Sequence, residues 1–166
     1  MPEESNYSIP DRKTAHPAAV KLLPEEFFWD ICDDNSPFGN DDGADTLATL
    51  TRYVNSGGSN LINFLDDLFS GWGVANRNLD LTTMDELEAA AKQGDIEMIV
   101  SMRDNAIIAS AFGQFLIQGK IDHQLKSLAM KAMKRRQLPT SIQLWTDPNE
   151  RTERLKLMEE RLQQIS

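Results

Sequence analysis

The chain has 166 residues, of which 40% are hydrophobic and 26% are charged. This length and composition suit one globular domain with a substantial core, and they exclude a fibrous or largely disordered chain. The formal net charge is −9, which disfavours contact with the phosphates of nucleic acid, so we expect no nucleic-acid partner.

Residues 1–16 are polar, contain proline and show no hydrophobic period, which predicts an N-terminal tail. This segment has no apolar core of the kind found in signal peptides. The single cysteine, Cys32, cannot form a disulfide within the chain, and we interpret it as a buried, inert thiol. Both features favour a cytoplasmic protein.

Residues 17–166 are predicted to form a single helical domain. Pro17 and Pro24 each suit the first turn of a helix. A short helix from Pro24 to about Cys32 would place Phe27, Phe28 and Ile31 near one face. The run from Asp33 to Asp42 is rich in Asn, Ser, Pro and Gly, which predicts a loop.

Two amphipathic helices are predicted next. The first starts near Asp42 and stops at Ser56-Gly57-Gly58. The second follows Ser59 as a possible N-cap, with an apolar stripe at helical spacing from Leu61 to Phe69. Thr82 or Thr83 can cap a third helix that ends before Gly94.

The segment at about 96–118 is apolar on most sides, which is typical of a helix buried at the centre of a bundle. Its apolar run is interrupted by Arg103-Asp104-Asn105, so we interpret it as a core helix and expect no contact with a membrane.

Two further helices complete the pattern. The one from Ile121 ends in the basic cluster Lys131, Lys134, Arg135 and Arg136, whose cations suit a helix C-terminus. After a break at Leu138–Ser141 and a possible short extended piece at Ile142–Trp145, Asp147-Pro148 starts the last helix. Its stripe of Leu155, Met158, Leu162 and Ile165 favours docking on the bundle over a dimer contact. We therefore predict an all-α single-domain bundle of about six or seven helices around the segment 96–118.

Charge is spread unevenly along the chain. Residues 1–95 contain 6 Lys or Arg against 18 Asp or Glu, whereas residues 96–166 contain 11 against 8. No cationic residue lies between Lys21 and Arg52, although that interval holds eight carboxylates and several large aromatic residues. Residues 25–45 are therefore the most specialised part of the sequence.

Two kinds of site fit this segment. As a surface for a basic partner protein, its aromatic residues would supply anchors and its acids would select the partner. The residues that we expect to contact the partner are Trp29, Asp33, Asp34, Phe38, Asp41 and Asp42.

As a metal site, the same segment would hold Mg²⁺. Glu26 and Asp30 are four residues apart, and so are Asp41 and Asp45. Carboxylate pairs at this spacing on neighbouring helices hold Mg²⁺ in all-α nucleotide pyrophosphatases, although the full spacing of that family is absent. The acids at 41, 42 and 45 also have a local explanation, because they suit a helix N-terminus.

The string SPFGNDDGADTL at residues 36–47 resembles an F-x-N-D-x-(G)-A-x-D signature of small bacterial proteins of unknown function. The matching positions are Phe38, Asn40, Asp41, Ala44 and Asp45. The resemblance implies a bacterial origin and a conformational role for this segment, and it implies no activity.

The first functional hypothesis is a non-enzymatic, acidic interaction domain that binds a basic protein through residues 25–45, as an immunity protein or antitoxin does. The alternative is a Mg²⁺-dependent all-α phosphohydrolase that uses Glu26, Asp30, Asp41 and Asp45. The first hypothesis needs no cofactor.

Overall fold

The computed structural model describes residues 10–74, 84–92 and 95–166, and all regular structure in these ranges is helical. The helices are α1 (Pro17–Leu22), α2 (Asp41–Asn55), α3 (Leu61–Gly71), α4 (Met84–Ala91), α5 (Asp95–Gln118), α6 (His123–Arg136), α7 (Pro139–Ile142) and α8 (Pro148–Gln164), with a 3-10 turn η1 (Glu26–Phe28) after α1. The predicted all-α class is confirmed. The proposed caps at Thr82 and Thr83 lie outside the described residues.

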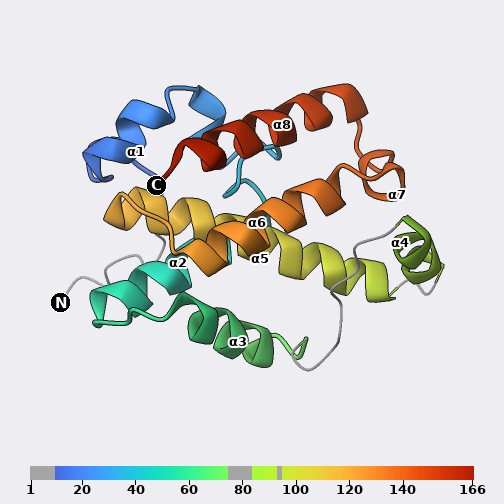
Figure 1. Ribbon diagram of the computed structural model, residues 1–166, viewed down its shortest axis with the longest axis horizontal. Helices are drawn as coiled ribbons and strands as arrows, with labels where there is room; N and C mark the ends of the chain where they lie inside the picture. The colour runs from blue at the N-terminus through green and yellow to red at the C-terminus, as the bar shows by residue number, and fades with distance from the viewer. Residues whose placement is uncertain (1–9, 75–83, 93–94) are drawn as a thin grey trace.

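Helix α5 is the centre of the molecule, as its composition predicted. Every residue from Ala106 to Leu116 is buried. Helices α1, α2, α3, α4 and α6 all contact α5, and α8 packs on α6 (Figure 1). Gly113 allows α2 to approach closely, because a Cβ atom at this position would lie 2.9 Å from Leu50. No helix in the described part of the chain is long and apolar enough to cross a membrane.

The last helix docks on the bundle. Leu155, Met158, Leu162 and Ile165 are all at least 97% buried and belong to the main core. Its N-terminus forms as expected, because Asp147 accepts a hydrogen bond from the Glu150 backbone N–H at 3.0 Å. This helix brings the C-terminal half of the chain back toward the N-terminal segment.

Four local predictions differ from the structure. The N-cap of α3 is Asn60 in place of Ser59, because the Asn60 side chain accepts a hydrogen bond from the Asn63 backbone N–H at 3.1 Å. Pro24 to Cys32 contains only the 3-10 turn η1, and Ile31 is 43% exposed. The piece at Ile142–Trp145 is not extended, because Ile142 ends the single-turn helix α7 and the chain continues in turns. Within the segment predicted as a tail, residues 10–16 lie on the bundle: the His16 backbone N–H donates to the Leu116 carbonyl at 2.7 Å. Residues 1–9 lie outside the described ranges.

Candidate functional site

The acidic segment is held in shape by its own polar side chains. Asp30 accepts a hydrogen bond from the Cys32 backbone N–H at 2.9 Å, and Asp33 accepts one from Asn35 at 2.9 Å. Asn40 is the N-cap of α2 and accepts from the Gly43 N–H at 2.7 Å. These short-range bonds are the ones that Asp and Asn make in turns and caps, so much of this polar composition has a structural role.

Two glycines let the segment fold tightly. A Cβ atom on Gly39 would lie 1.8 Å from the Asp33 carbonyl oxygen, and one on Gly43 would lie 2.2 Å from the Pro37 carbonyl oxygen. The backbone at Asp33 therefore runs directly beside the residues that lead into α2. The loop that carries Asp33 and Asp34 therefore packs against the residues at the start of α2.

The two aromatic residues expected to contact a partner are buried. Trp29 is 8% exposed and donates its indole N–H to the Leu23 carbonyl at 2.8 Å, while Phe38 is 1% exposed. Both rings belong to the main hydrophobic core, where removing their large apolar area from water stabilises the fold. The expectation that Trp29 and Phe38 lie on the surface and contact a partner is therefore wrong, because both are core residues.

The expectation that Cys32 is a buried thiol is also wrong. Its side chain is exposed and forms no disulfide. The residue lies in the turn that Asp30 holds, directly after the exposed Ile31. Burial of a small thiol is common, but this short turn faces solvent.

Arginines from both ends of the chain lie over the acidic segment. Arg12 contacts Glu26 at 3.0 Å, and Arg161 of α8 forms an ion pair with Glu25. Arg151 of α8 donates to the Asn35 carbonyl at 3.2 Å and is attracted by Asp33 and Asp34. The C-terminal half therefore does reach residues 25–45, chiefly through α8.

Two arginines of the basic cluster at the end of α6 pair with α5. Arg135 and Arg136 are buried and both contact Asp104 of α5, at 2.7 and 2.8 Å. Arg136 also lies 3.4 Å from Glu97. These two arginines hold α6 against α5, and their role is more than to oppose a helix dipole.

Five carboxylates of the acidic segment are exposed, and one of them, Glu26, is paired with Arg12. The other four are Asp30, Asp34, Asp41 and Asp45. We call this set the acidic face. Asp30, Asp41 and Asp45 form no ion pair with any residue that the structure describes. Asp33 and Asp42, also expected to contact a partner, are half-buried.

Asp42 has a raised pKa. Burial is the main cause, the negative charges of Asp41 and Asp45 add to it, and a hydrogen bond from the Asn105 side chain at 3.3 Å partly opposes it. The folded protein thus binds a proton at Asp42 more readily than the unfolded chain does. The charged carboxylate lowers stability at neutral pH, and this cost disappears as the pH falls through the pKa of the folded state.

We therefore expect the Asp42→Asn variant to gain stability relative to wild type at neutral pH, with the gap closing toward pH 4, near the ordinary aspartate pKa. Urea unfolding of both proteins across this range measures the gap. A gap that widened on acidification would contradict a raised pKa. The same substitution at the exposed Asp66 of α3 is the control.

The four residues of the metal hypothesis are not gathered into a cluster. Glu26 lies in η1 and pairs with Arg12, whereas Asp30 holds the turn at Cys32. Asp41 and Asp45 lie one turn apart on α2. Among the described residues, no group of three or more His, Cys, Asp or Glu side chains could hold a metal ion.

Sequence reasoning missed a polar cleft behind the acidic segment, which we call the arginine cleft. It encloses about 290 Å³ between the loop before α2 and helices α5, α6, α7 and α8. The residues lining it are Asp34, Asn40, Glu97, Ser101, Asn105, Arg136, Ser141, Leu144, Trp145 and Arg151. Arg151 could have been noticed, because it lies one turn before Leu155 on the apolar stripe of α8, where a charged side chain is unexpected.

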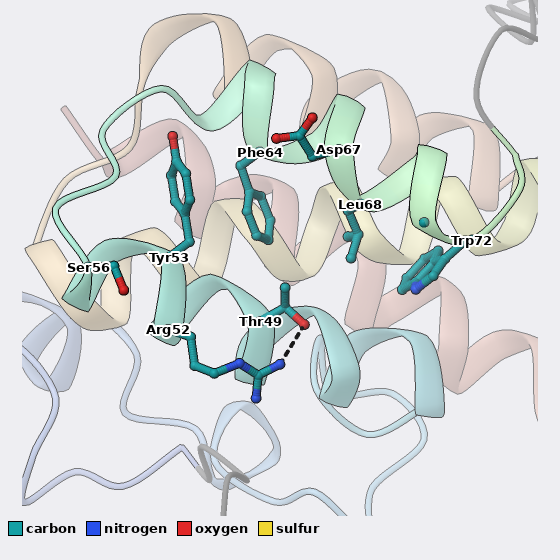
Figure 2. Close-up of a pocket in the computed structure, with 9 residues that line it drawn as sticks. Thr49, Arg52, Tyr53, Ser56, Phe64, Asp67, Leu68 and Trp72 are labelled. Atoms are coloured by element: carbon teal, nitrogen blue, oxygen red, sulfur yellow. Dashed lines mark hydrogen bonds between the residues drawn. The ribbon is translucent and has the colours of Figure 1, made fainter.

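A second, more apolar groove of about 590 Å³ lies between α2 and α3. Figure 2 shows Thr49 and Tyr53 of α2 facing Phe64 and Leu68 of α3. The Arg52 guanidinium donates a hydrogen bond to the Thr49 hydroxyl. The Tyr53 hydroxyl ties the two helices together, because it accepts from the Asn60 N–H and donates to the Asn60 carbonyl. None of the residues predicted for the site lines this groove.

The chain is similar in sequence to a curated protein of Escherichia coli. The chain is 30% identical over 138 residues to the uncharacterized protein YfeS of Escherichia coli strain K12, an alignment that covers 81% of this chain. The aligned region spans 55% of the length of YfeS. No family model matches the chain, and no solved structure matches it.

Proposed function

We propose that this chain is a non-enzymatic interaction domain that binds a basic protein through the acidic face. The observation that carries the proposal is the exposure of Asp30, Asp41 and Asp45, which have no ion pair with a described residue. Unpaired surface carboxylates on a chain of net charge −9 attract a positive partner and accelerate its association.

The form of the face supports this use. The carboxylates are carried by a loop that is fixed by Asp and Asn hydrogen bonds and by the first turns of α2. A rigid backbone reduces the conformational entropy lost on binding. Ile31, 43% exposed next to Asp30, offers an apolar contact in place of the buried Trp29 and Phe38.

One concrete version is a neutraliser of immunity or antitoxin type, in which the acidic face covers a basic surface of a nuclease or toxin. Such a role requires no metal or catalytic group in this chain. We place the protein in the cytoplasm, where a reducing environment suits the exposed Cys32 thiol.

The alternative, a Mg²⁺-dependent phosphohydrolase, has weaker support because Glu26 is paired with Arg12 and lies on a different element from Asp41 and Asp45. Calorimetric titration with Mg²⁺ or Mn²⁺ distinguishes the two hypotheses. Binding that is lost in the Asp41→Asn variant would favour the enzyme.

Removing three charges from the acidic face should weaken partner binding. In the triple variant Asp30→Asn, Asp41→Asn and Asp45→Asn, the asparagine at position 30 keeps the acceptor for the Cys32 N–H. The N-cap of α2, Asn40, is unchanged. We expect affinity for the physiological partner to fall by at least about tenfold, with a smaller dependence on salt, since close charge pairs at interfaces contribute about 1.5 kcal/mol or more. Crosslinking and mass spectrometry in the source cells identify the partner, and calorimetry measures its affinity.

The matched control removes three exposed charges elsewhere, with Asp66→Asn, Glu153→Gln and Glu160→Gln. Both triple variants have the same net charge, so they differ only in where the charge was removed. If both lost the partner equally, long-range attraction alone would explain the binding, and the acidic face would not be the site. If neither lost it, the proposal would be wrong.

A further inference from the structure

The arginine cleft contains two guanidinium groups whose hydrogen-bonding capacity is not fully used. Arg136 is 7% exposed and Arg151 is 5% exposed. The Arg136 Nη2 and the Arg151 Nε are buried and have no hydrogen-bond partner among the described residues. A buried donor without a partner is costly, so this cleft favours a ligand that brings acceptors.

The two arginines also repel each other. Burial and the nearby charge of Arg136 lower the pKa of Arg151 to about 10, so Arg151 is still charged at neutral pH. Arg136 shares the carboxylate of Asp104 with Arg135. A planar anion between Arg136 and Arg151 would relieve this repulsion and suit the fork of the guanidinium group.

The cleft also contains a negatively charged hydrogen-bond acceptor, Glu97. Glu97 uses one carboxylate oxygen, Oε1, toward Arg136 at 3.4 Å and Ser141 at 3.5 Å. Its other oxygen, Oε2, is buried without a partner among the described residues. A simple anion would leave this oxygen unpaired and would be repelled by it, whereas a ligand with a positive donor group would satisfy it.

We propose that the arginine cleft binds a small zwitterion of the α-amino acid class, with its carboxylate on Arg136 and Arg151 and its ammonium group on Glu97. The ligand's side chain points toward the mouth, where Leu144 is 73% exposed and the Trp145 ring stacks on Arg151 at 4.1 Å. The volume of about 290 Å³ is at the lower end of the range for small-molecule sites. This site borders the proposed partner interface, because Asp34 of the acidic face also lines the cleft. The groups that pair with the ligand, Arg136, Arg151 and Glu97, do not belong to that interface.

The test measures the melting temperature and calorimetric affinity of the full chain with single free L-amino acids at millimolar concentration. Propionate, propylammonium and inorganic phosphate are the comparison probes. We expect at least one amino acid to raise the melting temperature and all three comparison probes to have a smaller effect, since only the zwitterion pairs both kinds of group.

Two variants connect the effect to the cleft. Glu97→Gln should weaken amino-acid binding by about tenfold or more, because it removes the negative partner of the ammonium group. It should not weaken the response to propionate, because it also removes the negative charge that repels a simple anion. Ser101→Leu narrows the cleft from α5 and should abolish binding. Ser127→Leu, at an exposed position of α6, is the matched control and should bind as wild type does.

The proposal fails if no amino acid changes the melting temperature, which would mean that the cleft holds only water. It also fails if phosphate or propionate binds as well as any amino acid, or if Ser101→Leu binds like Ser127→Leu. The triple variant of the acidic face keeps Glu97, Arg136 and Arg151, so it should still bind the amino acid. Loss of the protein partner and loss of the amino acid are therefore separable outcomes.

Discussion

Replacing Asp104 with alanine should lower the free energy of unfolding by about 3–5 kcal/mol, the range for breaking a buried ion pair from one side. Asp104 is 1% exposed and contacts two arginines through both of its oxygens. Its removal would leave the charges of Arg135 and Arg136 buried between α5 and α6. Arg136 would keep only the longer contact to Glu97 at 3.4 Å.

Urea denaturation at neutral pH measures this loss. Asp66→Ala on the exposed surface of α3 should change stability by no more than about 0.5 kcal/mol, which is typical of surface positions. A loss below about 1 kcal/mol for Asp104→Ala would mean that water reaches the two arginines when the carboxylate is absent. In that case the burial of Asp104, Arg135 and Arg136 would not determine how much their ion pairs contribute to stability.

The helices were predictable because their signals are local. Apolar spacing in α3 and α8, and the all-round apolar character of α5, depend only on residues within a few turns of each other. Asp147 could be assigned as a cap for the same reason, since its acceptor meets an N–H three residues later. The fold class therefore followed from the sequence.

The pairing of charges was not predictable, because it depends on which helices meet. Arg161 reaches Glu25 across 136 positions of the chain, and Arg151 reaches Asn35 across 116. The sequence indicated that a cation was missing near Asp33 and Asp34, but it could not indicate that α8 supplies one. Nor could the sequence show whether Trp29 and Phe38 are core or surface residues. A loop has no periodic hydrophobic pattern that would indicate which of its side chains are buried.

Replacing Gly39 with alanine should destabilise the protein by about 2–3 kcal/mol, near the upper end for single substitutions. The added Cβ would lie 1.8 Å from the Asp33 carbonyl oxygen, and this oxygen already accepts from the Ser36 N–H at 2.9 Å. Because the clash would be between the new Cβ atom and a backbone oxygen, no flexible side chain can move aside to relieve it. The loop would have to open, so Phe38 would lose part of its place in the core.

Gly71→Ala is the matched control for this substitution. Gly71 is the last residue of α3, and nothing lies within 4 Å of a Cβ atom built there. Alanine at this position should be neutral or stabilising by up to about 1 kcal/mol, because it lowers the entropy of the unfolded chain and favours the helix. Thermal and urea unfolding of the two variants compare the same chemical change in crowded and open surroundings.

If Gly39→Ala were as stable as Gly71→Ala, the close approach of Asp33 to Gly39 would not hold the acidic face in place. The glycine in the FGND string would then have no conformational role, and the rigidity that supports partner binding would have to come from the Asp and Asn hydrogen bonds alone.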